Sequence, residues 1–184
     1  MNTSVWKPFW DYEKEEAWLN TMSAKGLALT RYTWMHYIFE DTDPGEYIYR
    51  IEMLAQRPDK PESVRYLDFL KDSGIEVVST YLDWVYLRKK AIDGPFDLYS
   101  DIDSRLAHAT RVSNMWLALA CSVSAIALSQ IPLATAAYQA GSRVWWLNIV
   151  GLVVCLVIAI GFVGLWLRHH RRAAKLQRDR KVQE

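Results

Sequence analysis

The sequence predicts an α+β domain built from a duplicated helix-plus-antiparallel-hairpin unit, followed by a two-helix transmembrane hairpin. The first observation is a division of charge. Residues 1–104 carry 12 Lys and Arg against 19 Asp and Glu, a net of −7, whereas residues 105–184 carry 10 against 2, a net of +8. The second is a pair of uncharged runs of about 24 residues each, and the third is an internal repeat within residues 1–104 at an offset of 48.

The overall composition excludes several classes of protein. The chain has 184 residues, of which 51% are hydrophobic and 23% charged, with a formal net charge of +1 and two cysteines. These values exclude a disordered chain, a collagen-like repeat, a disulfide scaffold and a strongly basic nucleic-acid binder. They do not exclude a membrane protein, because an average conceals two unlike halves.

A first helix is expected to begin after Asp11, whose carboxylate can accept a hydrogen bond from a free backbone N–H of the first turn. Glu13, Glu15 and Glu16 follow, where carboxylates complement the helix dipole, so we expect a solvated acidic face. Gly26 is expected to end the helix in a left-handed conformation. The apolar stripe of this helix comprises Trp18, Leu19 and Met22.

Two short strands are expected within residues 27–40, which are rich in β-branched and aromatic residues. Asp43, Pro44 and Gly45 indicate a turn, and residues 46–53 alternate as a third strand.

A second helix is expected to begin near Asp59, with Pro61 in its first turn and Glu62 completing a capping box. Gly74 ends it, and residues 75–90 predict a strand pair that turns near Leu82. A turn at 93–95 and a short run at 96–99 follow. The apolar stripe of the second helix comprises Val64, Leu67 and Leu70.

The two blocks match at the offset of 48. Leu19 aligns with Leu67, and Gly26 aligns with Gly74. A helix-plus-hairpin unit of this length cannot bury a face alone. We therefore expect the two units to share one antiparallel sheet with both helices on one side.

Two transmembrane helices are expected at residues 115–138 and 144–167. About 20 apolar residues suffice for a helix to cross a bilayer, and neither run is N-terminal, which excludes a cleaved signal peptide. Aromatic residues favour the headgroup layer, and Trp116, Tyr138, Trp145, Trp146 and Trp166 stand at the ends of the runs. The remaining boundaries are a cytosolic domain at 1–104, a juxtamembrane linker at 105–114, an external loop at 139–143 and a basic cytosolic tail at 168–184.

The basic tail predicts the orientation of the hairpin. Positive charge is retained on the cytoplasmic side, so we expect a multi-pass protein of the cytoplasmic (inner) membrane with both termini in the cytoplasm. A domain without cysteines suits that reducing compartment. The same charges attract anionic lipid. The residues assigned to topology and lipid contact are Arg168, Arg171, Arg172 and Lys175.

Small residues recur every four positions in the second span, at Gly151, Cys155 and Ala159. Such a stripe allows another helix to approach closely. The sequence leaves open whether these faces meet within one chain or between the chains of a homo-oligomer.

Four segments resemble a bacterial family catalogued as a domain of unknown function. They are FWDYEKEEAWLNTMSAKG (9–26), PGEYIYRIE (44–52), YLDFLKDSGIE (66–76) and DLYSDIDS (97–104), and the resemblance covers roughly residues 7–111. The resemblance implies a cytosolic domain of about a hundred residues followed by membrane helices, often encoded beside PadR-type transcriptional regulators. It implies no activity.

Aromatic residues are more numerous than two short helices require. Strand side chains alternate between faces, so one sheet face can be covered by the helices while the other is exposed. Such a face can bind a protein partner, a small hydrophobic compound or the membrane surface. The alternative is that these rings simply fill a well-formed sheet. The candidate binding residues are Trp34, Tyr37, Tyr47, Tyr49, Trp84 and Tyr86.

The sequence contains no recognisable set of catalytic residues. His36 is the one histidine of residues 1–104, and a lone strand histidine is usually a surface or packing residue. No cytosolic cysteine, glycine-rich phosphate loop or metal-spaced Cys/His cluster is present in the sequence. We therefore expect no catalytic residues, no metal and no cofactor.

Two functional hypotheses follow. In the first, the protein is a membrane-anchored, non-enzymatic regulatory or sensory protein whose cytosolic domain binds a protein partner. In the second, it is an accessory subunit or small oligomeric component of a transport or export system, with Ser122, Gln130 and Asn148 at a helix contact or polar path. The expected partners are the bilayer and a cytosolic or membrane protein, and we expect no nucleic acid because the folded domain is acidic.

Overall fold

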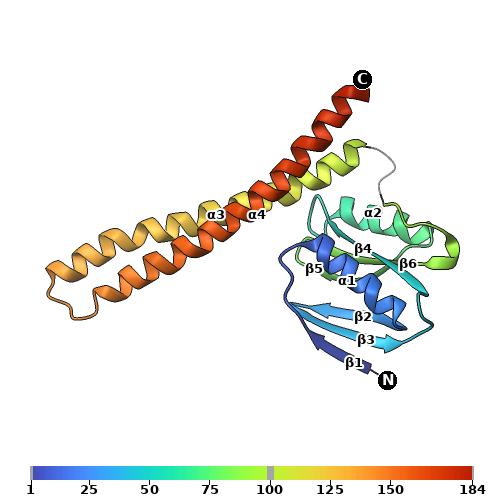
Figure 1. The fold of residues 1–184 in the computed structure, drawn as a ribbon, viewed down its shortest axis with the longest axis horizontal. Coiled ribbons are helices and arrows are strands. Elements are labelled where there is room, and N and C mark those ends of the chain that lie inside the picture. The colour runs from blue at the N-terminus through green and yellow to red at the C-terminus, as the bar shows by residue number, and fades with distance from the viewer. Residues whose placement is uncertain (1, 99–101, 184) are drawn as a thin grey trace. The chain divides into compact units, whose positions relative to one another are not determined.

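The computed structural model describes residues 2–98 and 102–183 of the chain. Contacts divide the chain into two compact units, Met1–Ser100 and Asp101–Glu184. The first is an α+β unit and the second is a pair of long helices, each shown in Figure 1. The predicted fold class is confirmed.

The N-terminal unit contains two successive repeats of the order strand, helix, strand, strand. The first repeat consists of β1 (Asn2–Trp6), α1 (Tyr12–Ala24), β2 (Leu27–Thr33) and β3 (His36–Asp41). The second consists of β4 (Tyr47–Met53), α2 (Pro61–Asp72), β5 (Glu76–Tyr81) and β6 (Trp84–Lys90), followed by a short 3-10 helix, η1 (Ala91–Asp93).

Each repeat forms its own three-stranded antiparallel sheet with the last strand in the centre. The orders are β1-β3-β2 and β4-β6-β5. The ladders are interrupted at equivalent places, between Leu29 and Arg31 in the first repeat and between Val77 and Ser79 in the second. These interruptions lie 48 residues apart, the offset of the sequence repeat, which confirms the duplicated unit.

The expectation of one shared sheet is wrong, because side chains take the backbone groups that would join the two halves. The Leu29 N–H donates to the Tyr49 hydroxyl at 2.8 Å. The N–H and the carbonyl of Tyr32 both bond to the Ser79 hydroxyl, at 3.4 and 3.1 Å. β2 and β5 are therefore neighbours without a backbone ladder between them.

The two helices also do not lie on one side. Tyr86 of β6 packs in a cluster with Leu19 of α1, whereas Val85 and Leu87 pack in a second cluster with Leu70 of α2. Since successive strand residues point to opposite faces, the sheet of the second repeat is covered on both faces, as Figure 1 shows.

The two helix starts differ from each other. Asp11 caps α1 as predicted and accepts a hydrogen bond from the Glu13 N–H at 3.2 Å. The predicted capping box of α2 is wrong: the N-cap residue is Lys60, which makes no side-chain cap bond. Glu62 instead accepts a hydrogen bond from the Gln56 amide.

Two further expectations differ from the structure. Val64 was expected in the buried stripe of α2 but is 42% exposed, and Ser63 is buried in its place. The strand β1 lacks a hydrophobic alternation that would predict it and exists because β3 pairs with it along five residues. Of the run 96–99, Phe96 is buried in the second cluster, and Tyr99 lies outside the described residues.

The second unit consists of α3 (Ile102–Gln139) and α4 (Trp146–Gln183), each of 38 residues. At 1.5 Å per residue each is about 57 Å long, against about 30 Å of bilayer hydrocarbon. Both are long and apolar enough to cross a membrane, and only 17% and 6% of their most apolar windows are buried within the chain. These exposed apolar helices indicate a membrane-associated protein.

The predicted linker, 105–114, and most of the predicted tail, 168–183, continue these helices. Pro132 lies inside α3 without ending it. The start of α3 and the end of α4 therefore both extend beyond the uncharged runs.

Small residues form the contact between α3 and α4. A side chain added at Gly151 would meet the Gln130 side chain at 3.5 Å, Cys155 is half-buried and Ala159 is buried. The predicted stripe thus faces α3 of the same chain. On α3 the buried partners recur every seven residues, as in a coiled coil, at Ser113, Ala120, Ala127 and Ala134.

Candidate functional site

Half of the predicted aromatic binding surface is not at the surface. Tyr37, Tyr49 and Tyr86 are buried in the core between α1 and the two sheets. The expectation that they are exposed is wrong, because it assumed one uncovered face of a single sheet.

The other three predicted residues occupy different environments. Tyr47 and Trp84 are half-buried and pack against the first core cluster. The Trp84 ring lies 5.6 Å from that of Tyr12, at the start of α1. Trp34 alone of the six is exposed, at 61%.

Trp34 belongs to a group of exposed apolar side chains at one end of the N-terminal unit. It lies in the β2–β3 turn, Leu82 lies in the β5–β6 turn, and Trp6 and Trp10 lie at the end of β1 and in the loop that follows. Their exposed fractions are 58–71%. We call these four residues the tip surface.

Contacts between the segments hold this end of the unit together. The Lys7 N–H donates to the Met35 carbonyl at 2.9 Å, which ties the loop after β1 to the β2–β3 turn. The Trp6 ring stacks on His36 at 4.5 Å. The Tyr32 and Tyr81 rings, each just before a turn, lie 5.7 Å apart. The two turns therefore point to the same end of the unit.

Both turns hold a large side chain in a backbone conformation that favours glycine or asparagine. Trp34 and Met35 have φ of 34° and 66°, and Leu82 has φ of 54°. Left-handed backbone is costly for large L-residues and tends to cluster at functional sites. Because Trp34 and Leu82 are equivalent residues of the two repeats, a large side chain has this unfavourable left-handed backbone conformation in both repeats.

Beneath the tip surface, Glu15 of α1 connects the two repeats. Its Oε1 accepts hydrogen bonds from the hydroxyls of Tyr37 at 2.6 Å and Tyr86 at 2.7 Å, one from each sheet. Burial raises the pKa of the Glu15 carboxyl above its ordinary value, and the two tyrosine hydrogen bonds oppose that rise. Burial beside Glu15 in turn raises the pKa of both tyrosines, so they remain donors.

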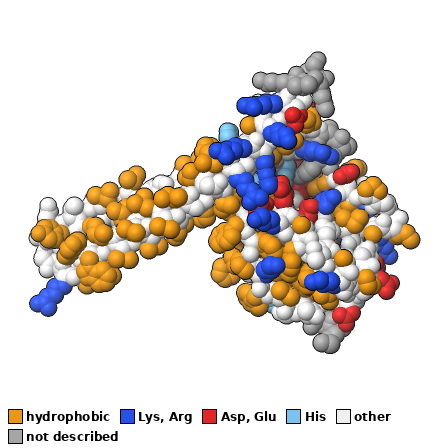
Figure 2. Space-filling model, viewed as in Figure 1, with side chains coloured by type: hydrophobic (Ala, Val, Ile, Leu, Met, Phe, Trp, Pro, Cys, Tyr) orange, Lys and Arg blue, Asp and Glu red, His pale blue; other side chains and the backbone are white. Residues whose placement is uncertain are grey.

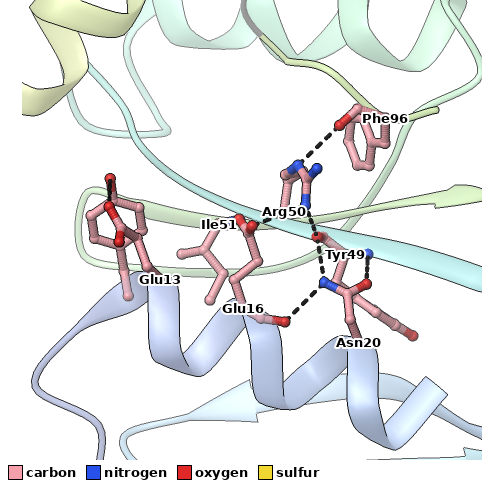
Figure 3. A network of polar contacts seen from close by, with 8 residues as sticks. Glu13, Glu16, Asn20, Tyr49, Arg50, Ile51 and Phe96 are labelled. Carbon is pink, nitrogen blue, oxygen red and sulfur yellow. Dashed lines mark hydrogen bonds and ion pairs between the residues drawn. The ribbon is translucent and has the colours of Figure 1, made fainter. Parts of the chain in front are cut away.

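α1 also closes the outer edge of β4, as Figure 3 shows. The Asn20 side chain accepts from the Tyr49 N–H at 2.8 Å and donates to the Tyr49 carbonyl at 3.1 Å. Glu16 accepts from the Ile51 N–H at 3.0 Å and from Arg50 at 2.9 Å. The side chains thus supply the partners that another strand would supply.

The same pattern continues along the edge. Ser23 donates to the Tyr47 carbonyl at 2.6 Å and accepts from the Tyr47 N–H at 3.3 Å. Burial raises the pKa of the Glu16 carboxyl, while the Ile51 N–H and Arg50 lower it. The helix therefore bonds to three alternate residues of β4.

The expected solvated acidic face of α1 is wrong for Glu15 and Glu16. Glu15 is buried and Glu16 half-buried. A signal was present in the sequence: Glu15, Leu19 and Ser23 recur every four residues, so Glu15 lies on the buried stripe of the helix.

Titratable groups elsewhere are dispersed. Among residues 2–98 and 102–183, no three His, Cys, Asp or Glu side chains form a group that could hold a metal ion. His36 contacts the Ser4 hydroxyl at 2.6 Å and stacks on Trp6, so it packs within the first sheet. On α4, Arg168, Arg171 and Lys175 are exposed and Arg172 is half-buried.

Comparison with known proteins gives one match. A family model described as "Protein of unknown function (DUF2812)" matches residues 11–121, from the N-cap of α1 into α3. No curated protein and no solved structure matches the chain. Because the matched segment is more than half of the chain and includes both helices of the duplicated unit, this chain belongs to the protein family of unknown function DUF2812.

Proposed function

We propose that this chain is a membrane-anchored, non-enzymatic regulatory or sensory protein whose N-terminal unit binds a protein partner through the tip surface. The observation that carries the proposal is the pair of equivalent turns that display Trp34 and Leu82 with φ of 34° and 54°. A left-handed turn that served folding alone would favour Gly, Asn or Asp.

The composition of the tip surface supports a protein partner. Tryptophan is enriched among the residues that dominate binding energy at protein interfaces, and three of the four residues are tryptophans with more than half of their surface exposed. The fixed turns reduce the conformational freedom lost on binding, which favours affinity.

The proposed location is the cytoplasmic membrane, with α3 and α4 as two spans and both termini in the cytoplasm. The distribution of charge supports this orientation, because the segment after residue 167 carries seven Lys and Arg whereas the loop 139–143 carries only Arg143. A reporter protein that is active only in the cytoplasm should be active when it is fused after Glu184. Activity at that position of a reporter that works only outside the cytoplasm would contradict the orientation.

Partner binding is tested by cross-linked pull-down of the full-length protein from its native membrane. The test variant is W34S/L82S, and the control is F69S/I92S, which removes two side chains that are 63% and 89% exposed on other elements. We expect the test variant to lose the cross-linked partner while the control retains it. Equal recovery by both variants would contradict binding at the tip surface.

The same experiment separates this proposal from the alternative of an accessory subunit of a transport or export system. In that case the partner would contact the outward faces of α3 and α4, and both variants would capture it equally. Substitution of an outward residue of the hairpin, such as Ala125→Leu on the exposed face of α3, would then release it.

A further inference from the structure

The outer edges of the two sheets are not all closed. Side chains of α1 close the edge of β4, and β2 and β5 lie beside each other, bridged by the Tyr49 and Ser79 hydroxyls. β1 forms the remaining edge, as the sheet order and Figure 1 show. Within residues 2–98 and 102–183, no strand lies on its outer side. An edge of this kind can pair with a further strand.

The register of β1 on β3 shows which backbone groups point outward. The N–H of Lys7, just after β1, donates to the carbonyl of Met35, just before β3. In an antiparallel pair, opposite residues alternate between those that exchange hydrogen bonds and those that do not. The residues two and four positions before Lys7 therefore also bond to β3. The backbone groups that point away from β3 belong to the other three residues of the strand: Asn2, Ser4 and Trp6.

The sequence of β1 has none of the usual features that prevent edge pairing. Charged side chains, proline and β-bulges commonly protect an open edge. The strand NTSVW contains no charged residue and no proline, and its ladder with β3 runs through five residues without a shift. Ser4 and Trp6 are exposed on its solvent face, whereas Val5 packs against the first core cluster. The edge is therefore neutral, regular and accessible.

The outward groups of β1 are complementary to those of a second copy. When two β1 strands run antiparallel with Ser4 opposite Ser4, Asn2 of each copy lies opposite Trp6 of the other. In this register each outward N–H of one copy meets an outward carbonyl of the other. On the inner face Thr3 lies opposite Val5, a pair of β-branched side chains that favours strand pairing. The contact is therefore self-complementary, as a two-fold dimer requires.

The charges around β1 favour the antiparallel direction. Glu40 and Asp41, at the end of β3, lie near the start of β1, whereas Lys7 follows its end. Antiparallel pairing brings the Lys7 end of one copy beside the acidic end of the other, whereas parallel pairing brings like charges together. The Lys7 Nζ lies 5.0 Å from the Phe9 ring and 4.8 Å from the Trp18 ring. The charges therefore set the direction of pairing without a new ion pair.

We propose that two copies of this chain associate through β1, which pairs antiparallel with β1 of the second copy and joins the two first-repeat sheets into one. The pairing uses only the backbone of Trp6, so the tip surface stays available and the inference goes beyond the proposed function. Five residues make a small interface, and anchoring in one membrane favours such a contact by raising the effective concentration of the copies. Figure 2 shows the hydrophobic side chains that cover α3 and α4 and support this anchoring.

The test is disulfide formation between full-length chains in native membranes, in a C121A/C155A background that removes the two native cysteines. S4C is the test variant, because residues opposite each other in a hydrogen-bonded pair have Cα atoms about 5.5 Å apart, within reach of a disulfide. W6C is the matched control. Position 6 lies on the same face and its side chain is 69% exposed, but the two copies of it would lie about 13 Å apart along the strands. We expect on the order of tenfold more dimer from S4C than from W6C.

A mixture of differently tagged N2C and W6C chains tests the register. We expect the mixed dimer to form as readily as the S4C dimer, and neither N2C alone nor W6C alone to form one. The mixed pair also serves if the S4C variant does not fold. Dimers from N2C alone and W6C alone would mean parallel pairing, and equal yields at all three positions would mean random collision. Either result would overturn the proposal.

The remaining outcomes concern the occupant of the edge. No dimer from S4C or from the mixed pair would overturn the pairing, and a cross-link from S4C to another protein would assign the edge to a strand of that protein. The W34S/L82S variant separates this inference from the proposed function. We expect it to keep the S4C dimer while it loses the partner at the tip surface. Loss of the dimer in W34S/L82S would show that the partner bridges the two copies and would overturn direct pairing.

Discussion

The two repeats share one chain order and one sheet order, yet their helices have different roles. α1 lies between the repeats and bonds to both, through Glu15 to a tyrosine of each sheet and through Asn20 to the edge of β4. α2 covers only the sheet of its own repeat. At the positions 48 residues after Glu15, Glu16, Asn20 and Ser23, α2 carries Ser63, Val64, Asp68 and Lys71.

This difference shows which residues join a duplicated unit into one body. The apolar stripe of α2 packs on the sheet of its own repeat, whereas Leu19 of α1 packs against both sheets. Val64, Asp68 and Lys71 are all exposed, whereas the equivalent residues of α1 take the free backbone groups of β4. The polar residues of α1 that have no counterpart on α2 therefore act together with Leu19 to join the two repeats into one unit.

The largest expected effect is that of E15A, which leaves the Tyr37 and Tyr86 hydroxyls buried without their acceptor. Each such group costs about 1–3 kcal/mol, so we expect a loss of about 3–4 kcal/mol in the free energy of unfolding. Denaturant unfolding of the full-length protein in detergent, followed by near-UV circular dichroism, measures it. S63A in α2, which removes one bond to the Gln56 carbonyl, should cost about 1 kcal/mol. Equal effects would contradict the unequal roles of the helices.

A second comparison uses equivalent glycines. Gly26 and Gly74 both have φ of +79°, but an added Cβ at Gly26 would lie 2.8 Å from the Thr42 carbonyl oxygen, whereas at Gly74 it meets nothing within 4 Å. We expect G74A to cost about 1 kcal/mol, from the left-handed backbone alone. G26A should cost about 2–3 kcal/mol, since a backbone atom must also move. The same unfolding measurement applies, and a G74A effect as large as that of G26A would contradict the geometry.

The edge of β4 gives a smaller effect. N20A removes two hydrogen bonds to the Tyr49 backbone and should cost about 1–2 kcal/mol, together with faster amide exchange along β4 by hydrogen-exchange mass spectrometry. D68A, at the equivalent exposed position of α2, should change stability by less than about 0.5 kcal/mol. Unchanged exchange at β4 in N20A would show that α1 does not close this edge.

The pH dependence of stability tests the buried carboxyl. Because burial raises the folded-state pKa of Glu15 above 4.5, the stability that this group contributes is fully present below pH 4.5 and is lost as the pH rises through the folded pKa. E15Q keeps an acceptor for both tyrosines and does not ionise. Relative to E15Q, the wild type should lose stability by about 1.4 kcal/mol for each unit of pKa shift. Parallel pH profiles of the two proteins would contradict a desolvated Glu15.

The smallest effect is expected at the turns. W34G relieves a left-handed tryptophan, which costs about 1–2 kcal/mol, and adds the entropy cost of glycine, about 0.5–1 kcal/mol. We expect a net gain in stability of about 0.5 kcal/mol. T33G, one residue earlier in β2, should instead destabilise by about 0.5–1 kcal/mol. A W34G variant that is less stable than T33G would show that the Trp34 side chain serves the fold.

Much of this architecture could be predicted from the sequence, because it depends on local signals. The two uncharged runs, the Asp11 cap and the alternation along β4 each reflect a rule that acts over a few residues. The repeat at an offset of 48 predicts that the helix and two strands of the first half recur in the second half of the unit. The interruptions of both ladders at equivalent positions show that the repeat also governs details within the strands.

The contacts between repeats could not be predicted in the same way. Tyr49, from β4, reaches the Leu29 N–H of β2, and Tyr86 reaches Glu15 across 71 residues. Which tyrosines are core and which are exposed depends on how the two sheets face each other. For that reason the sequence shows that aromatic residues are unusually numerous, but not which of them are exposed. Tyr37, Tyr49 and Tyr86 were wrongly predicted to be exposed. The exposed residues Trp6, Trp10 and Leu82 were not predicted as binding residues.

The most direct test of partner binding at the tip surface is site-specific photo-cross-linking in intact cells. A photoreactive residue is placed at position 34 of the full-length protein and, in a control, at position 69 on α2, whose side chain is equally exposed at 63% against 61%. Partner binding at the tip surface predicts a discrete cross-linked protein from position 34 and none from position 69. The same product from both positions, or one from position 69 alone, would contradict partner binding at the tip surface.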